Sequence, residues 1–288
     1  MNHGSQTVTR KAPAKLNLSL RVIARRGDGF HEIDTLMVPL PGLHDVLTLE
    51  PAVGGTRLSC NDATLPTDGG NLVVRAANAF AEATGIDAGA RIHLEKRIPS
   101  GAGLGGGSSD AAATLLGLRE LHGTALDDDA LRELAADIGS DVPFFLQSGP
   151  ARCTGRGEVV TPVSGPPSTG PLPVLLLKPS FPVATADAYR RALDPGVAAI
   201  PGIPMEPSRI DGLTLVNDLE RPVFAKHRLL AELKLWLALR AECRAALMSG
   251  SGSVVFAVLH PGVDAEALTR AARHELDATL WSWHGEAG

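Results

Sequence analysis

The segment of residues 99–109 has the sequence PSGAGLGGGSS and places five glycines between a strand pattern at residues 91–98 and a helical pattern at residues 111–121. Glycine lets backbone N–H groups approach an anion closely, and the N-terminus of a following helix adds a favourable dipole. A flexible turn without a ligand is the alternative, and glycines between a strand and a helix make it the minor one. The pattern therefore predicts a phosphate-binding loop. Its residues are Pro99, Ser100, Gly101, Ala102, Gly103, Leu104, Gly105, Gly106, Gly107, Ser108 and Ser109.

The sequence of this segment separates several kinds of phosphate loop. A Walker A loop ends in Gly-Lys-Ser or Gly-Lys-Thr, and the segment contains no lysine. The run GAGLGG at residues 101–106 matches the dinucleotide fingerprint, but a Rossmann core begins with an apolar strand, whereas residues 92–98 (IHLEKRI) are amphipathic. The partner motifs of a protein kinase are absent. A dinucleotide oxidoreductase or a non-enzymatic nucleotide-binding module stays as the weaker alternative.

The composition indicates which partners to expect and in which compartment the protein is expected. The chain has 288 residues, 44% of them hydrophobic, which is enough for one large domain or two modest ones. Its formal net charge is −5 and no basic run stands out, so we expect neither nucleic acid nor a membrane as a partner. Three widely spaced cysteines without a CxxC pair favour a reducing compartment over a disulfide or zinc framework. The first residues lack the apolar stretch of a secretory signal, and we expect a cytoplasmic protein.

Hydrophobic spacing predicts the main elements. Strands are expected at residues 14–22, 35–40, 46–49, 56–59, 91–98, 174–177, 253–259 and 280–284. Helices are expected at residues 71–84, 111–121, 127–138, 186–193, 223–240 and 264–278, the first with Asn71 as its N-cap and Gly85 after its end. A boundary or long loop is expected at residues 163–173. Strands and helices mix without a regular βαβ rhythm, which favours an α+β fold.

Three segments in the same order resemble the motifs of the GHMP kinases, the superfamily of galactokinase, homoserine kinase and mevalonate kinase. They are APAKLNLSL at residues 12–20, PSGAGLGGGSSDAA at residues 99–112 and MSGSGS at residues 248–253. The resemblance implies a two-lobed α+β kinase that uses ATP and Mg²⁺. Residues 1–165 would form an ATP-binding lobe of ribosomal-protein-S5-like fold, and residues 166–288 a ferredoxin-like lobe on the substrate side.

Within the superfamily, PAKLNLSL, GFHE at residues 29–32 and GSDVPFF at residues 139–145 are together similar to one branch. That branch phosphorylates the 2-hydroxyl of a cytidine-diphosphate-linked methylerythritol in the non-mevalonate isoprenoid pathway. The implied partner is this small molecule, and the implied assembly is a monomer or weak homodimer. Another small-molecule kinase of the superfamily, of the homoserine or mevalonate type, is the alternative.

The resemblance also implies the roles of individual residues. Lys15 and Asp141 would be catalytic, with Asp141 as the general base, and an aromatic pair would enclose the cytosine, whose edge His31 reads. On spacing alone, Lys15 and Asn17 are more typical of a solvated strand face, and Asp141 of an N-cap before Pro143. Phe30 stands where the branch often has tyrosine, so it keeps a stacking face and lacks the hydroxyl. The implied substrate-binding residues are Asn17, Phe30, His31, Thr185, Tyr189, Gly250 and Gly252.

Overall fold

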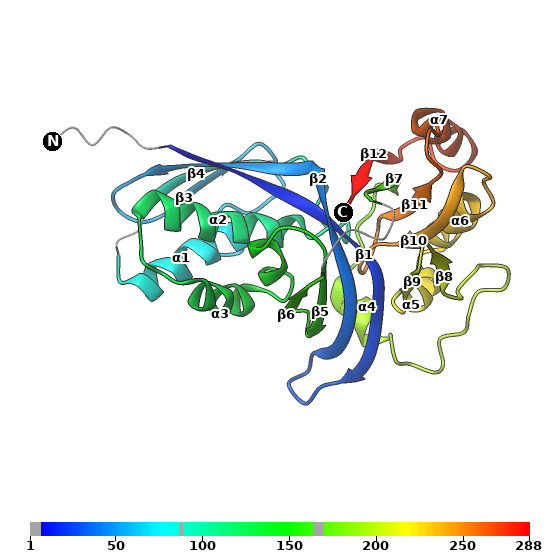
Figure 1. Ribbon diagram of the computed structural model, residues 1–288, viewed down its shortest axis with the longest axis horizontal. Helices are drawn as coiled ribbons and strands as arrows, with labels where there is room; N and C mark the ends of the chain where they lie inside the picture. The colour runs from blue at the N-terminus through cyan, green and yellow to red at the C-terminus, as the bar shows by residue number, and fades with distance from the viewer. Residues whose placement is uncertain (1–6, 87–88, 164–169) are drawn as a thin grey trace. The chain divides into compact units, whose positions relative to one another are not determined.

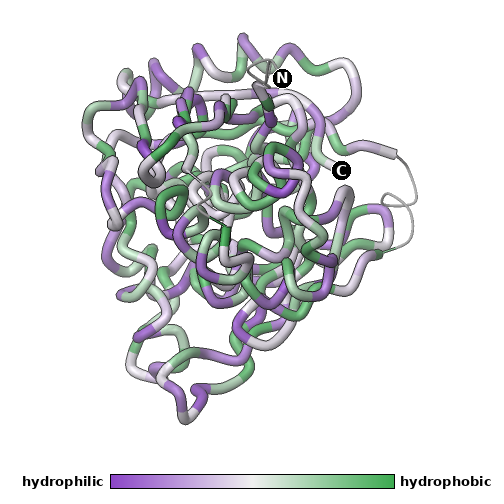
Figure 2. The backbone as a smooth tube through the Cα atoms, turned by 90° about the vertical axis from the view of Figure 1, so that its left-hand side faces the viewer, coloured by the Kyte–Doolittle hydropathy of each residue, from purple (hydrophilic) through white to green (hydrophobic). Residues whose placement is uncertain are grey.

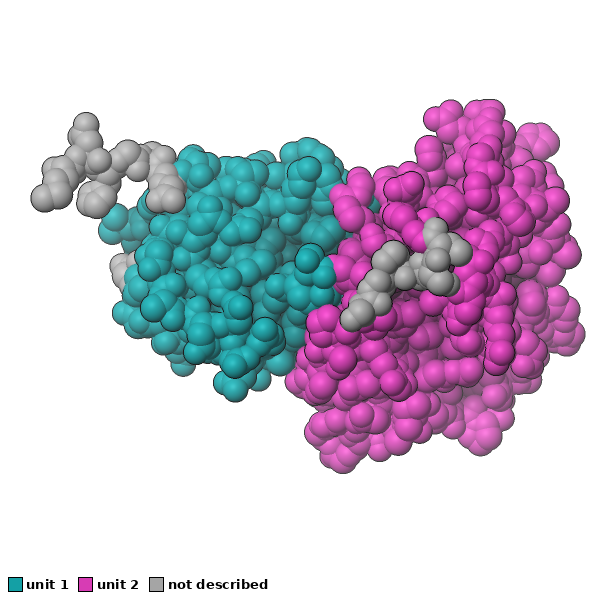
Figure 3. Space-filling view, viewed as in Figure 1, with its two compact units in different colours: residues 1–14, 43–99, 105–148 teal, residues 15–42, 100–104, 149–288 magenta. Residues whose placement is uncertain are grey.

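The computed structural model describes residues 7–86, 89–163 and 170–288 (Figure 1). Two compact units divide the chain (Figure 3). Unit 1 comprises Met1–Ala14, Leu43–Pro99 and Gly105–Ser148, and unit 2 comprises Lys15–Gly42, Ser100–Leu104 and Gly149–Gly288. Two long strands, β1 (Val8–Arg25) and β2 (His31–Pro51), contribute residues to both units. The assignment of ATP to residues 1–165 and of substrate to residues 166–288 stays a prediction.

Unit 1 is a sheet with helices over one face. The end of β2 pairs antiparallel with β4 (Ala90–Glu95), and β3 (Arg57–Cys60) pairs parallel with β4. Alternate residues of β4 are buried, which gives this sheet one apolar face. Helices α1 (Leu72–Thr84), α2 (Gly106–His122) and α3 (Asp128–Ile138) pack against one another, with the short 3-10 helix η1 (Pro143–Leu146) against α2.

The ends of α1 and α3 follow from local side chains. Asn71 accepts a hydrogen bond from the N–H of Val73, and Gly85 after the helix has φ +64°. Asp127 accepts from the N–H of Ala130 in the same way. These caps satisfy orphan backbone groups at the helix ends, and they confirm the predicted helices of residues 71–84 and 127–138.

Unit 2 holds strands in two sheets. The start of β2 pairs with β5 (Ala151–Gly155), which pairs with β6 (Val159–Pro162), while β1 pairs parallel with β9 (Leu213–Asn217) and β9 with β8 (Ser208–Ile210). The second sheet has the order β10–β11–β7–β12 and is antiparallel throughout. Its strands are β10 (Cys243–Met248), β11 (Val255–Leu259), β7 (Leu172–Lys178) and β12 (Trp281–Ala287). The helices are α4 (Thr185–Arg190), α5 (Glu220–Lys226), α6 (Arg228–Ala238) and α7 (Ala265–Glu275).

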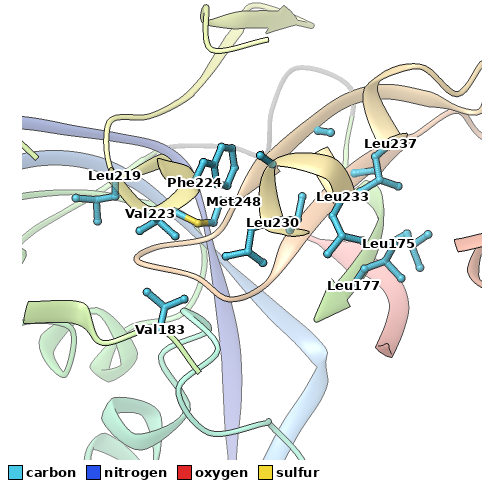
Figure 4. Packing of buried hydrophobic residues seen from close by; sticks show 14 of the residues in the cluster. Leu175, Leu177, Val183, Leu219, Val223, Phe224, Leu230, Leu233, Leu237 and Met248 are labelled. Carbon is cyan, nitrogen blue, oxygen red and sulfur yellow. The ribbon is translucent and has the colours of Figure 1, made fainter. Parts of the chain in front are cut away.

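The core of unit 2 lies between this second sheet and its helices (Figure 4). Leu175 and Leu177 of β7 and Leu230 and Leu233 of α6 are fully buried in it. Met248, at the end of β10, belongs to the same core. The turn that follows Met248 is therefore attached to a well-packed base.

Several predicted boundaries were wrong. The strands expected at residues 35–40 and 46–49 form the single strand β2, which runs on through Pro39 and Pro41. The helix expected at residues 223–240 is two helices, because His227 (φ −120°, ψ 78°) leaves the helical conformation between α5 and α6. Helix α2 begins at Gly106 rather than at residue 111, so part of the Gly-rich segment is already helical. Strand β10 had not been predicted. Residues 164–169 of the expected boundary lie outside the described residues.

Hydrophobic and hydrophilic residues are interspersed along the backbone (Figure 2). Accordingly, within the described part of the chain, none of the helices combines the length and the apolar character that crossing a membrane requires.

Candidate active site

Lys15 and Asn17 lie side by side on β1 and are both buried, at 3% and 2% exposure. Lys15 Nζ donates to Asn17 Oδ1 (2.6 Å) and to the carbonyl of Gly103 (3.0 Å). Asn17 Nδ2 donates in turn to the hydroxyl of Thr35 (2.8 Å) on β2. A solvated strand face is therefore the wrong interpretation for this pair, and buried charge in such a setting is characteristic of a functional site.

The turn after β10 lies against this pair. A Cβ on Gly250 (φ +54°) would stand 3.0 Å from the Gly103 carbonyl, 3.3 Å from Lys15 Nζ and 3.4 Å from Asn17 Oδ1. A Cβ on Gly103 (φ +77°) would lie only 2.1 Å from the carbonyl oxygen of Ser249, whose hydroxyl donates to Gly103 O (3.0 Å). The three segments that contain Lys15, Gly103 and Gly250 thus meet within unit 2. Glycine is required at the two positions where their backbones come closest.

Helix α2 begins with backbone N–H groups that have no acceptor within the helix. Gly105 is its N-cap in the left-handed conformation (φ +71°) and offers no side-chain cap. The first intrahelical hydrogen bond runs from the N–H of Ser109 to Gly105 O (2.9 Å), so the preceding N–H groups have no intrahelical acceptor. Ser109 Oγ is buried and lacks a protein partner, as expected of a group that serves a ligand.

A buried ionic cluster connects the two sides of the Gly-rich segment in unit 1. Lys96 Nζ pairs with Asp45 and with Asp110 Oδ2 (2.8 Å), and all three side chains are at most 7% exposed. Asp45 Oδ1 accepts from the backbone N–H groups of Arg97 (2.5 Å) and Ile98 (2.8 Å), just before the segment. Asp110, in α2, follows the segment directly. The cluster therefore holds both the entry and the exit of the Gly-rich segment.

This cluster has two carboxylates for one ammonium. Burial raises the pKa of Asp110 to about 7, opposed by the charge of Lys96 and aided by that of Asp45. Burial alone would lower the pKa of Lys96, but the two carboxylates outweigh it and raise that pKa. The two directions are consistent, because two carboxylates beside one ammonium favour a charged Lys96 and a protonated Asp110. Asp110 Oδ1 has no protein partner.

An aromatic surface lies at the start of β2 in unit 2. The rings of His31 and Tyr189 are 5.5 Å apart and tilted by 35°, and the guanidinium of Arg156 stands 4.8 Å from the centre of the Phe30 ring. Burial, with a contribution from the charge of Arg25, lowers the pKa of His31, which favours the neutral ring. Phe30 is 49% exposed. The surface thus offers stacking faces and a neutral imidazole, the groups that recognise a flat heterocycle.

Of the remaining predicted residues, Thr185 and Gly252 belong to unit 2 and Asp141 belongs to unit 1. The hydroxyls of Thr185 and Ser251 are 2.8 Å apart, which connects the start of α4 with the Gly250 turn. A Cβ on Gly252 (φ +88°) would meet Met248 Sδ at 3.0 Å. Asp141 is in unit 1, where Val142 and not Asp141 occupies the N-cap position of η1, without a side-chain hydrogen bond. Its N-cap interpretation therefore fails, and its proximity to Lys15 stays a prediction.

Sequence reasoning missed some residues around the site. The only sequence feature that marks Arg156 is its place between two glycines. Thr35, Asp45 and Lys96 are marked only as polar residues within predicted strands or next to them. Asn217 and Glu220, from the NDLE run before the predicted helix, are buried and reach the Gly250 turn. Among the described residues there is no group of three His, Cys, Asp or Glu side chains placed to hold a metal ion.

Two family models and several known proteins match this chain. The family models "GHMP kinases N terminal domain" and "GHMP kinases C terminal" match residues 71–149 and 205–278. A 4-diphosphocytidyl-2-C-methyl-D-erythritol kinase of Methylacidiphilum infernorum is 43% identical over 86% of this chain and 84% of that protein.

Solved structures are similar as well. A crystal structure of 4-(cytidine 5'-diphospho)-2C-methyl-D-erythritol kinase covers 98% of this chain and 99% of its own, with 40% identity and a TM-score of 0.77. A homoserine kinase from Cytophaga hutchinsonii, at 20% identity, covers 98% of this chain and 94% of its own with a TM-score of 0.66. At that identity the second similarity concerns the fold alone.

Proposed function

This chain belongs to the GHMP kinase family, among its 4-diphosphocytidyl-2-C-methyl-D-erythritol kinases, and we propose that it transfers a phosphoryl group from ATP to the 2-hydroxyl of that cytidine-linked polyol. The observation that carries the proposal is the convergence of Lys15, Asn17, Gly103 and Gly250 in unit 2. It combines a buried cation with close glycine backbone, the arrangement that phosphoryl transfer needs.

ATP, with Mg²⁺, supplies the γ-phosphoryl group. The Gly-rich segment fits a polyphosphate because the first N–H groups of α2 have no intrahelical acceptor and Ser109 Oγ is buried without a partner. These donors would hold phosphate oxygens and orient the terminal phosphorus toward the acceptor. Mg²⁺ commonly keeps waters and phosphate oxygens as ligands.

Lys15 and Asp141 divide the chemistry in this proposal. Asp141 would take the proton of the 2-hydroxyl as the hydroxyl oxygen attacks the γ-phosphorus and ADP leaves. Lys15 would offset the charge on the oxygens of the transferred group. A buried lysine that is already oriented by Asn17 and the Gly103 carbonyl needs little reorganisation to do so. Gly250 and Gly252 allow the backbone of the turn to approach the substrate.

The cytosine is proposed to lie on the aromatic surface of unit 2. Phe30 and Tyr189 supply stacking faces, and the neutral ring of His31 can both donate to and accept from the polar edge of the base. Arg156 makes a cation–π contact with the Phe30 ring. Thr185 would contact the diphosphate that joins the base to the polyol.

A coupled assay of ADP release tests the substrate. We expect turnover with 4-diphosphocytidyl-2-C-methyl-D-erythritol and at least about 10⁴-fold lower kcat/KM with mevalonate, homoserine or galactose. None of these three compounds has a base to occupy the aromatic surface. Binding any of them would leave the polar groups of that surface unpaired, and this disfavours them strongly against the cytidine-linked substrate. Equal kcat/KM for any of the three would refute the assignment and favour another GHMP kinase activity. Position-specific phosphorus NMR of the product identifies the 2-hydroxyl as the acceptor.

A further inference from the structure

The side chain of Asn217, at the end of β9, holds the backbone of the turn after β10. Asn217 is 4% exposed. Its Nδ2 donates to the carbonyls of Met248 (2.7 Å) and Gly250 (2.7 Å), while its Oδ1 accepts from the N–H of Leu219 (2.9 Å). Every polar hydrogen of the amide is therefore used, and two of its three bonds go to the turn. A buried amide with such complete pairing fixes its partners in one arrangement.

Glu220 holds the other backbone group of Met248. Its Oε1 accepts from the N–H of Met248 (2.9 Å), and its Oε2 accepts from Lys234 Nζ (2.6 Å) on α6. Both side chains of this ion pair are at most 5% exposed. Met248 is thus bound at its N–H by Glu220 and at its carbonyl by Asn217, and its side chain is packed in the core beside Phe224 (Figure 4).

The turn held in this way contacts the buried lysine. Gly250 lies so close to Lys15 and Asn17 that a Cβ there would be within 3.4 Å of both side chains. The Gly103 carbonyl accepts from both Lys15 Nζ and the Ser249 hydroxyl, each at 3.0 Å. A shift of the turn would therefore move the Gly103 carbonyl, a partner of Lys15, through the Ser249 hydroxyl. No sequence pattern indicated this link, because Asn217 and Lys15 lie far apart in the chain and meet only through the turn.

We propose that Asn217 and Glu220 are positioning residues for phosphoryl transfer, which fix the 248–250 turn against Lys15. They do not touch the substrate in this proposal. They set where the Gly250 backbone and the Lys15 ammonium lie relative to the transferring group. The proposal rests on the kinase function above. Because misplacement of about 1 Å at a reacting centre can cost about 10²-fold in rate, the effect should be seen in kcat.

Asn217→Asp is the sharpest test, since it replaces one NH₂ by oxygen and leaves the acceptor for the Leu219 N–H. The new oxygen would face the two carbonyls of Met248 and Gly250 and repel them. We expect kcat to fall by about 10²-fold, with the ATP dissociation constant from calorimetry changed by less than about threefold. Leu237→Ala is the matched control, because it opens a cavity in the same core on α6 without touching the turn. It should lower the melting temperature and leave kcat at 25 °C within about twofold of wild type.

Two outcomes would overturn the proposal. The first is a loss of kcat for Asn217→Asp that is no larger than the loss for Leu237→Ala, when the two variants have similar melting temperatures. The second is full additivity of Asn217→Asp with Lys15→Met, because a residue that acts through Lys15 should add less than about threefold once Lys15 is gone. If Asn217→Asp does not fold, Glu220→Gln decides in its place by the same two criteria, since it keeps an acceptor for the Met248 N–H while weakening the pair with Lys234.

The test separates this inference from the proposed function. The wild-type protein alone decides which substrate is phosphorylated. Whatever small-molecule acceptor it uses, the comparison of variants is made with that acceptor, so a wrong substrate and a wrong positioning role give different results.

Discussion

Lys15 illustrates how a single buried charge depends on its partners. Its ammonium donates to the amide oxygen of Asn17 and to the backbone carbonyl of Gly103, and these two contacts orient it. Replacement of Lys15 by methionine keeps an unbranched side chain one atom shorter and removes the charge. We expect turnover to fall by at least about 10²-fold in the ADP-release assay, and an unchanged rate would show that Lys15 has only a structural role.

Asp141 is expected to act on the acceptor and not on ATP. The change Asp141→Asn preserves shape and removes the base, and loss of a positioned general base typically costs about 10²–10⁴-fold in kcat. The ATP dissociation constant, measured by calorimetry, should stay within about twofold of wild type. A variant with wild-type kcat would remove Asp141 from the mechanism.

Asp110 should make stability depend on pH. Its pKa is about 7 in the folded protein, against 3.8 for the ordinary group, so between these values the folded state binds more protons than the unfolded state. The contribution of Asp110 to the free energy of unfolding should therefore fall as pH rises from about 4 to 7. Asp110→Asn cannot ionise and should flatten this slope.

Urea denaturation at pH 5 and pH 8 measures the effect for both proteins. The wild type should lose more stability over this interval than the variant. Parallel pH profiles for the two proteins would mean that Asp110 does not carry the excess proton of the Lys96 cluster.

At the scale of elements, the Gly-rich segment contains glycines with different constraints. Gly103 and Gly105 have positive φ, whereas Gly107 lies in the first turn of α2 with helical geometry. A Cβ on Gly107 would only meet Leu72 Cδ1 at 3.6 Å, an ordinary contact. Alanine at this position should thus be tolerated by the fold, and it should stabilise the helix by roughly 0.5–1 kcal/mol.

Gly107→Ala therefore separates a phosphate-binding segment from a plain turn. If phosphates approach the backbone here, the added methyl should weaken ATP binding by about tenfold or more while the melting temperature stays equal or rises. Binding of the cytidine-linked substrate alone should not change. Calorimetric titration with each ligand gives both numbers, and unaltered ATP affinity would contradict phosphate binding at the start of α2.

Local sequence signals predicted some elements well and others poorly. Helices α1 and α3 were found because Asn71, Gly85 and Asp127 mark their ends by side-chain or backbone chemistry that acts within a few residues. The break at His227 and the continuity of β2 through Pro39 depend on partners elsewhere in the fold. Strand β10 was missed because its ends are set by pairing with β11 and its own sequence has no strong alternation of polar and apolar residues.

The site was predicted in part for the same reason. Glycine-rich runs and the PAKLNLSL segment point to phosphate and to Lys15 through recognisable motifs. Asn217, Glu220 and Arg156 contact residues far away in the chain, and such contacts leave no trace in local spacing.

At the scale of the whole molecule, the C-terminal strand completes the second sheet of unit 2. All seven residues of β12 (Trp281–Ala287) pair with β7, and the N–H of Gly288 donates to Pro39 O (3.1 Å). A chain ending at Leu280 would leave the buried strand β7 with an open edge. At about 1 kcal/mol per net hydrogen bond, we expect a loss of at least about 3 kcal/mol and a melting temperature lower by about 6–12 °C.

Differential scanning calorimetry of the shortened chain checks this expectation. A single unfolding transition at the wild-type temperature would show that β12 contributes little to the sheet.

The way the backbone passes between the two units has a consequence for how such a protein can change by recombination. The chain passes from one unit to the other after residues 14, 42, 99, 104 and 148. After a single genetic crossover within residues 15–148, each unit therefore contains segments from both parents. Exchange of one intact unit would need a crossover at each of the five junctions. New acceptor specificity in this architecture should arise more readily by point substitution on the aromatic surface around Phe30 and Arg156 than by swapping a module.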